Sequence, residues 1–146
     1  MRGISIKAVF FGGVTDIVAS TILGIPFGIY VVSSHGLTNL HKDALRSAVL
    51  AVIHGSPFLY AAQLFIGFGS SILGGYVAAS LARENKRLNG ILAAWLCVGI
   101  GVYALVTGQD GMSPVTVSLM IAVTPLCYLL GALLQAKRAA SRSSPA

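Results

Sequence analysis

The sequence has few charged residues. They make up 10% of the 146 residues, and only four of them are acidic. A soluble domain carries about 25% charged residues, which keep its surface hydrated. Hydrophobic residues make up 55% of this chain, and its mean hydropathy is +0.83. The composition therefore excludes an ordinary water-soluble domain and predicts one that lies in lipid.

Sequence motifs of catalysis are also missing. The chain has no nucleophile motif, no phosphate-binding Walker loop and no GxGxxG fingerprint. Its two cysteines, Cys97 and Cys127, each lie inside an apolar run and form no CxxC pair. Free cysteine commonly behaves as a small buried hydrophobic residue. We therefore expect no enzyme activity and no cofactor.

Metal-ligand spacing is absent as well. The three histidines, His35, His41 and His54, all fall in the polar connection 33–56, near Asp43. A metal site needs three or four converging ligands, and no HxxxH pair is present. We expect these histidines to be solvated at the membrane interface and to bind no metal, with a metal site as the alternative.

Four apolar runs predict an integral membrane four-helix bundle of the all-α class. The predicted spans are 8–32, 57–82, 89–107 and 114–135. The 25 residues of the first run make about 37 Å of helix, enough to cross about 30 Å of hydrocarbon. A cleaved signal peptide is the alternative, but its apolar core has only about 7–15 residues. Ser56–Pro57 and Ser113–Pro114 open the second and fourth spans, because serine caps free N–H groups and proline suits the first helical position.

The connection between the first two spans contains an amphipathic stretch. Over residues 39–54, apolar residues recur at intervals of three and four, with polar residues on the other side. This pattern predicts an additional helix in the plane of the membrane interface; an early, tilted start of the second span is the alternative. We expect one transmembrane domain over 1–136 and a disordered cytoplasmic tail over 137–146.

The basic residues predict the topology. The chain has a net charge of +6, but its ten Lys and Arg residues lie at the ends of apolar runs and form no basic face, so we expect no nucleic-acid partner. Eight of the ten fall in segments that an even number of spans puts on one side: Arg2, Lys7, Arg83, Lys86, Arg87, Lys137, Arg138 and Arg142. The positive-inside rule then puts both termini in the cytoplasm, in a multi-pass protein of the cell inner (plasma) membrane.

Asp16 is the one acidic residue inside a predicted span. It lies about 12 Å from the cytoplasmic end by helix rise, where an uncompensated charge costs at least about 2.5–3.5 kcal/mol. Residues at a similar depth in the other spans include Cys97, and three of them can hydrogen-bond the carboxyl group: Ser71, Thr124 and Tyr128. One hypothesis is a site that binds a proton or a cation. The other is a hydrogen-bonded aspartate that holds helices together.

Small residues recur at every fourth position of the predicted spans. Residues four apart share a helix face, and small side chains let helices approach closely in lipid. The packing positions predicted in this way are Gly12, Ser20, Gly24, Gly28, Gly67, Gly75, Ala79 and Gly101. They predict packing within one chain or, since the face on 8–32 is long enough for two partners, contact in a homo-oligomer.

The hairpin over 74–90 resembles a pattern of uncharacterised bacterial four-span inner-membrane proteins. A Gly-Gly-aromatic helix end, Gly74-Gly75-Tyr76, is followed by a basic turn and a small-residue helix start, Asn89-Gly90. The resemblance implies a bacterial inner-membrane protein and no particular activity. The overall plan is also similar to that of small multidrug transporters, which have four spans and one carboxylate in the first, but this chain departs from them in its long first connection and its one-sided basic residues.

Two functions follow from these observations. The first is a non-enzymatic membrane protein that assembles with itself or with a membrane-protein partner through its small-residue faces. The alternative is a small proton-coupled transporter that uses Asp16, the candidate carboxylate that the likeness to small multidrug transporters implies.

Overall fold

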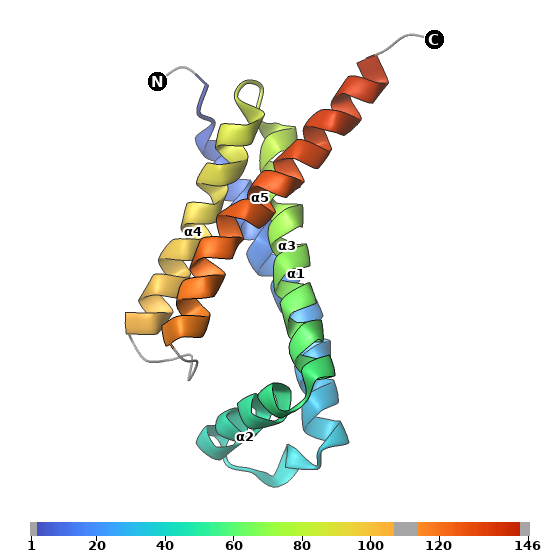
Figure 1. Ribbon diagram of the computed structural model, residues 1–146, viewed down its shortest axis with the longest axis vertical. Coiled ribbons are helices and arrows are strands. Elements are labelled where there is room, and N and C mark those ends of the chain that lie inside the picture. Colours follow the sequence, from blue (N-terminus) through green and yellow to red (C-terminus); the bar gives the residue numbers. More distant parts are fainter. Residues whose placement is uncertain (1–2, 107–113, 144–146) are drawn as a thin grey trace. The chain divides into compact units, whose positions relative to one another are not determined.

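The structure is a computed structural model that describes residues 3–106 and 114–143, and over these ranges it is all-α, without strands (Figure 1). The all-α class agrees with the sequence prediction. Two of the described helices, the first and the third, are long and apolar enough to cross a membrane. The elements are α1 (Ile6–Ser34), the 3-10 turn η1 (Leu37–Asn39), α2 (Lys42–Gly55), α3 (Pro57–Leu81), α4 (Lys86–Val106) and α5 (Pro114–Ser143).

Serine hydroxyls bind free N–H groups at the starts of α1 and α3, whereas Ser113, expected to do so before α5, lies outside the described residues. The hydroxyl of Ser5 accepts the N–H of Ala8 at 3.3 Å, just before α1. At the start of α3, Ser56 is extended and its hydroxyl accepts the N–H of Leu59 at 3.5 Å. These contacts satisfy N–H groups that have no partner within the helix.

The described residues divide into two compact units where the sequence predicts one domain. We call Met1–Ala19 with Phe68–Ala146 the bundle unit, and Ser20–Gly67 the hairpin unit. Helices α1 and α3 are each divided between the units, with one segment in the bundle unit and the other in the hairpin unit. The division arises because the start of α1 and the end of α3 pack with α4 and α5, whereas their other segments belong with α2.

Small side chains form the core of the bundle unit. Ala78, Ala93, Ala94 and Tyr128 are fully buried and form one cluster, and α4 packs along α5. A Cβ atom added to Gly12 would lie 2.9 Å from the carbonyl oxygen of Gly74 and 3.1 Å from Cβ of Ala93. The helices of this unit therefore meet at backbone distance, which only small residues allow.

The hairpin unit has a separate apolar core. Val31 of α1, Ile53 of α2 and Leu59 of α3 are buried together, and partly buried side chains surround them: Phe27, Val49, Val52 and Tyr60. Helix α2 is the amphipathic helix expected over 39–54, although it begins later, at Lys42. The alternative of an early start of the second span is wrong, because the extended backbone of Ser56 separates α2 from α3.

The C-terminal segment differs from its prediction. The sequence predicts a disordered tail over 137–146, whereas α5 continues as a helix to Ser143. The physical reason is local: Ala139, Ala140 and the preceding basic residues are good helix formers. Residues 144–146 lie outside the described part of the chain.

Candidate functional site in the bundle unit

Asp16 is the centre of a hydrogen-bond network in the bundle unit. Its side chain lies on α1 and is 6% exposed. The oxygen Oδ2 accepts hydrogen bonds from Tyr128 Oη at 2.8 Å, from Ser71 Oγ at 3.1 Å and from Cys97 Sγ at 3.2 Å. The donors belong to α5, α3 and α4 respectively. One carboxyl oxygen therefore connects all four helices of the unit.

Two of the donors also contact each other. Cys97 Sγ lies 3.2 Å from Tyr128 Oη, and either atom can donate in this pair. Tyr128 is fully buried, and Cys97 is half-buried and free of any disulfide. Burying a carboxylate is costly unless hydrogen bonds replace its water, and a hydrogen bond to a charged group contributes about 1.5–3 kcal/mol. The three donors can therefore stabilise the buried side chain of Asp16, and this side chain is also a group that could bind a proton.

Glycines on α3 bring Tyr128 within reach of α1. A Cβ atom on Gly74 would lie 3.0 Å from both Cζ and Oη of Tyr128. On Gly75 it would overlap the backbone of Tyr128, and on Gly131 it would overlap the backbone of α3 at Ile72. Without these side chains α5 lies against α3, so that the tyrosine hydroxyl extends past α3 to the carboxyl group of Asp16.

The structure brings together most of the residues that depth along the helices selects. Ser71 and Tyr128 donate directly to Asp16. Thr124 is half-buried one turn before Tyr128. Cys97 lies at the expected depth, but the sequence does not mark it as a donor, because thiols are weak hydrogen-bonding groups.

The predicted small-residue positions separate into two groups. In the bundle unit, Gly12 and Gly75 are closely packed and Ala79 is fully buried. A Cβ on Gly101 in the same unit would make an ordinary contact with Ile121 at 3.9 Å. In the hairpin unit Ser20 is half-buried, and a Cβ added to any of three positions would meet nothing within 4 Å: Gly24, Gly28 and Gly67.

The open glycines of α1 lie in a groove on the hairpin unit. The groove has a volume of about 540 Å³ and is lined almost entirely by apolar atoms. Its residues come from the second half of α1 and from η1: Thr21, Gly24, Ile25, Gly28, Ile29, Val32, Ser33 and Thr38. Because Gly24 and Gly28 have no side chain, the surface of α1 is flat where it lines this groove.

Asn89 forms a second polar centre, which sequence reasoning did not find. Its side chain is fully buried at the start of α4. Oδ1 accepts the N–H of Ser5 at 2.7 Å, and Nδ2 donates to the carbonyl oxygens of Gly3 at 2.9 Å and Glu84 at 3.0 Å. A polar residue just inside an apolar span is the sequence signal that could have identified it. Asn89 ties the N-terminal segment to the α3–α4 connection.

The three histidines belong to the hairpin unit, whereas both polar centres belong to the bundle unit. In the hairpin unit, His35 Nδ1 lies 3.1 Å from the carbonyl oxygen of Val31, and His54 Nδ1 lies 2.8 Å from that of Leu50. His41 precedes α2 as an exposed residue. Within residues 3–106 and 114–143, no three His, Cys, Asp or Glu side chains converge in a way that could hold a metal ion.

Comparison of the chain with protein-family models, with curated proteins and with solved structures finds no match. The geometry of the two units therefore provides the basis for a function.

Proposed function

We propose that this chain is a four-span membrane protein that assembles, without enzymatic activity, through the open glycine face of its hairpin unit. The observation that carries the proposal is the contrast between glycines. Most glycines of the bundle unit are in contact with other residues of the chain. Gly24 and Gly28 lie in an apolar groove, where an added Cβ atom would meet nothing within 4 Å. Close approach of helices over small residues is what drives their association in lipid, and the partner is a second copy or another membrane protein.

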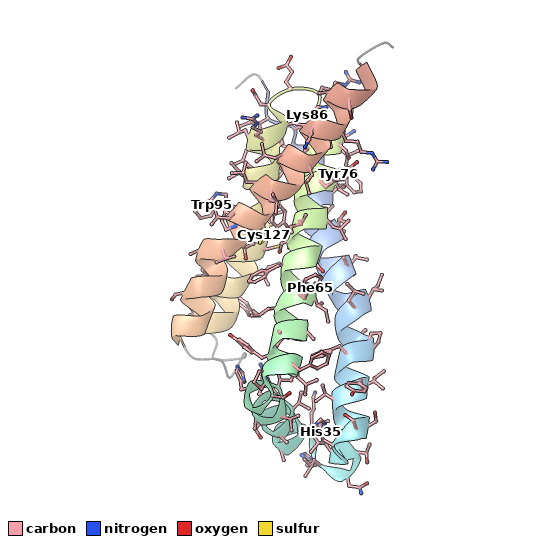
Figure 2. All side chains as sticks on the ribbon, turned by 45° about the vertical axis from the view of Figure 1, so that its right-hand side comes forward. His35, Phe65, Tyr76, Lys86, Trp95 and Cys127 are labelled. Atoms are coloured by element: carbon pink, nitrogen blue, oxygen red, sulfur yellow. The ribbon has the colours of Figure 1, made fainter. Side chains whose placement is uncertain are left out.

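The surface of the described residues supports a location in the membrane. Large apolar side chains are exposed along the long helices, among them Ile6 at 82%, Phe65 at 83% and Trp95 at 62%. Trp95 projects away from the bundle in Figure 2. Exposure of this extent favours a lipid environment over water, and α1 and α3 have the length and composition to cross it.

The distribution of basic residues supports cytoplasmic termini. Hydrogen bonds of Asn89 hold the start of α1 against the start of α4, and Arg138 Nη1 donates to Tyr76 Oη at 3.3 Å, which brings α5 to the end of α3. Tyr76 and Lys86 lie toward the same end of the bundle unit in Figure 2. A basic end of a bundle is typical of the cytoplasmic side of a bacterial inner membrane, and four spans keep both termini there.

Substitution of the open glycines tests the assembly proposal. We expect Gly24→Leu and Gly28→Leu to shift the protein toward monomer in liposomes, measured by single-molecule photobleaching, because a leucine side chain would hold a partner helix away. Gly99→Leu is the matched control, since Gly99 of α4 is equally open but lies outside the groove. An unchanged oligomer in both groove variants would refute the proposal.

A second candidate function rests on the network around Asp16. A buried carboxyl group that accepts three donors from three helices can bind and release a proton as those helices move. This geometry supports a small proton-coupled transporter as the alternative. In liposomes that contain a pH-sensitive dye, Asp16→Asn should then abolish proton uptake while leaving the fold and the oligomeric state intact. Equal uptake by the variant and the wild type would refute the transporter.

A further inference from the structure

An open groove lies at the basic end of the bundle unit, where α1 begins and α3 ends. Its volume is about 530 Å³, within the range of small-molecule sites. It is lined by eight residues of one unit: Gly3, Ile4, Ser5, Lys7, Phe11, Leu81, Arg83 and Glu84. Its lining includes neither Asp16 nor any residue of the glycine groove in the hairpin unit, and neither proposed function uses it.

The lining of the groove combines charged and apolar side chains. Lys7 comes from the first turn of α1, and Arg83 and Glu84 come from the connection between α3 and α4. Phe11 lies one turn further along α1 from Lys7, and Leu81 is the last residue of α3; both are half-exposed. The lining therefore has two cations and one carboxylate, which give it a net positive charge, together with two large apolar side chains.

The walls of this groove are held in place by Asn89. Its amide binds the backbone of Gly3 and Ser5 on one wall and the carbonyl oxygen of Glu84 on the other. Gly3 has a φ of +111°, and a Cβ atom there would overlap the side chain of Asn85. A fully buried side chain with all its polar atoms engaged fixes the groove in advance, which reduces the ordering cost of binding a ligand.

We propose that this groove binds the phosphate headgroup of an anionic phospholipid. Lys7 and Arg83 would bind the phosphate, since a guanidinium group matches phosphate oxygens and both cations lie on the same groove. The acyl chains would follow Phe11 and Leu81 onto the exposed apolar face of the unit. The net single positive charge of Lys7, Arg83 and Glu84 complements a lipid with one negative charge. The inference rests on the proposed placement of this end at the cytoplasmic surface, where basic pockets between helices bind lipid headgroups.

The test measures lipid preference in nanodiscs that contain either phosphatidylglycerol or phosphatidylcholine. A fluorescent phosphatidylglycerol probe is titrated onto the full-length protein, and its affinity is compared between variants. We expect Lys7→Gln and Arg83→Gln each to weaken binding about fivefold, the effect of one basic residue at an anionic surface. The matched control is Arg87→Gln, which removes the same charge from the first turn of α4, close in sequence to Arg83, but does not line the groove.

Each outcome decides the proposal. Equal losses in Arg87→Gln and in the groove variants would show general attraction to a basic surface and overturn it. Displacement of the probe by millimolar inorganic phosphate would show a site for the free ion and overturn the lipid assignment. A tighter or unchanged affinity in Glu84→Gln supports an anionic lipid, whereas a weaker affinity would assign Glu84 to an ammonium group and point to a zwitterionic lipid instead.

The oligomeric state of the same samples separates this inference from the assembly function. We expect Lys7→Gln and Arg83→Gln to keep the wild-type oligomer, because both residues lie outside the glycine groove of the hairpin unit. A loss of lipid binding with an intact oligomer supports the headgroup site by itself. Reporter fusions at both termini test the topology independently, and an extracellular location of either terminus would overturn the placement on which the inference depends.

Discussion

Glycines at the helix contacts of the bundle unit and glycines in the groove of the hairpin unit differ in what surrounds them. In the bundle unit, Gly12, Gly74 and Gly75 are in contact with neighbouring helices, and a methyl group at any of them would collide. In the hairpin unit, Gly24 and Gly28 follow the same four-residue spacing on the same helix α1 but have no neighbour. The comparison teaches that spacing shows which face of a helix is flat, whereas only the surrounding structure shows whether that face is occupied.

The units also differ in what they bury. The bundle unit encloses Asp16, Ser71 and Asn89, each with hydrogen-bond partners. The core of the hairpin unit is built from branched apolar side chains, with Val31, Ile53 and Leu59 at its centre. Substitutions of the buried polar groups and closely packed glycines of the bundle unit should therefore have large effects, and substitutions of the open glycines of the hairpin unit small ones. Three predictions test this difference.

The largest effect is expected for Asp16→Ala. It leaves the hydroxyl groups of Tyr128 and Ser71 and the thiol of Cys97 without their acceptor. A buried donor without a partner costs about 1–3 kcal/mol, so we expect a loss of about 3 kcal/mol or more in the free energy of unfolding, measured by denaturation in detergent micelles. Asp16→Asn retains an acceptor oxygen and should lose less. Equal losses in the two variants would contradict the role of the network.

A smaller loss is expected for Gly75→Ala. The added methyl group would overlap the backbone of Tyr128, so α3 and α5 must move apart. Overpacking of this kind costs about 1–3 kcal/mol, and the melting temperature of the purified protein should fall. The network around Asp16 should loosen at the same time, seen as a shift of the carboxyl band in infrared spectra. A melting temperature equal to that of the wild type would show that the helices are not in close contact here.

The smallest effect, with the opposite sign, is expected for Gly28→Ala. A methyl group at this position meets nothing within 4 Å, and alanine favours a helix over glycine by about 0.5–1 kcal/mol. The thermal stability of the monomer in detergent should therefore rise slightly. A fall as large as that of Gly75→Ala would remove the distinction between the two units.

The sequence predicts features that depend on the regular geometry of a helix. Because each residue adds a constant rise, counting along the spans placed Ser71 and Tyr128 near Asp16, and both donate to it. The Ser56–Pro57 pair marked the start of α3 in the same local way. These features are visible in the sequence because each depends on the distance along one chain segment.

Features that depend on irregular or distant backbone could not be predicted in this way. The partners of Asn89 are backbone groups of the N-terminal segment and of a connection, which leave no side-chain pattern. The division between the units falls inside α1 and α3, and both helices continue unbroken through it, so no turn or loop marks it in the sequence. The continuation of α5 to Ser143 was missed because a serine- and alanine-rich composition is compatible with both a coil and a helix.

The hydrogen bonds to Asp16 also fix an order of events during synthesis. The donors Ser71, Cys97 and Tyr128 follow the aspartate by 55, 81 and 112 residues. At a translation rate of about 5–20 residues per second, the last donor is made roughly 6–20 seconds after the carboxyl group it binds. The first helix is therefore made with an incomplete site, and only the synthesis of the final helix supplies the last donor.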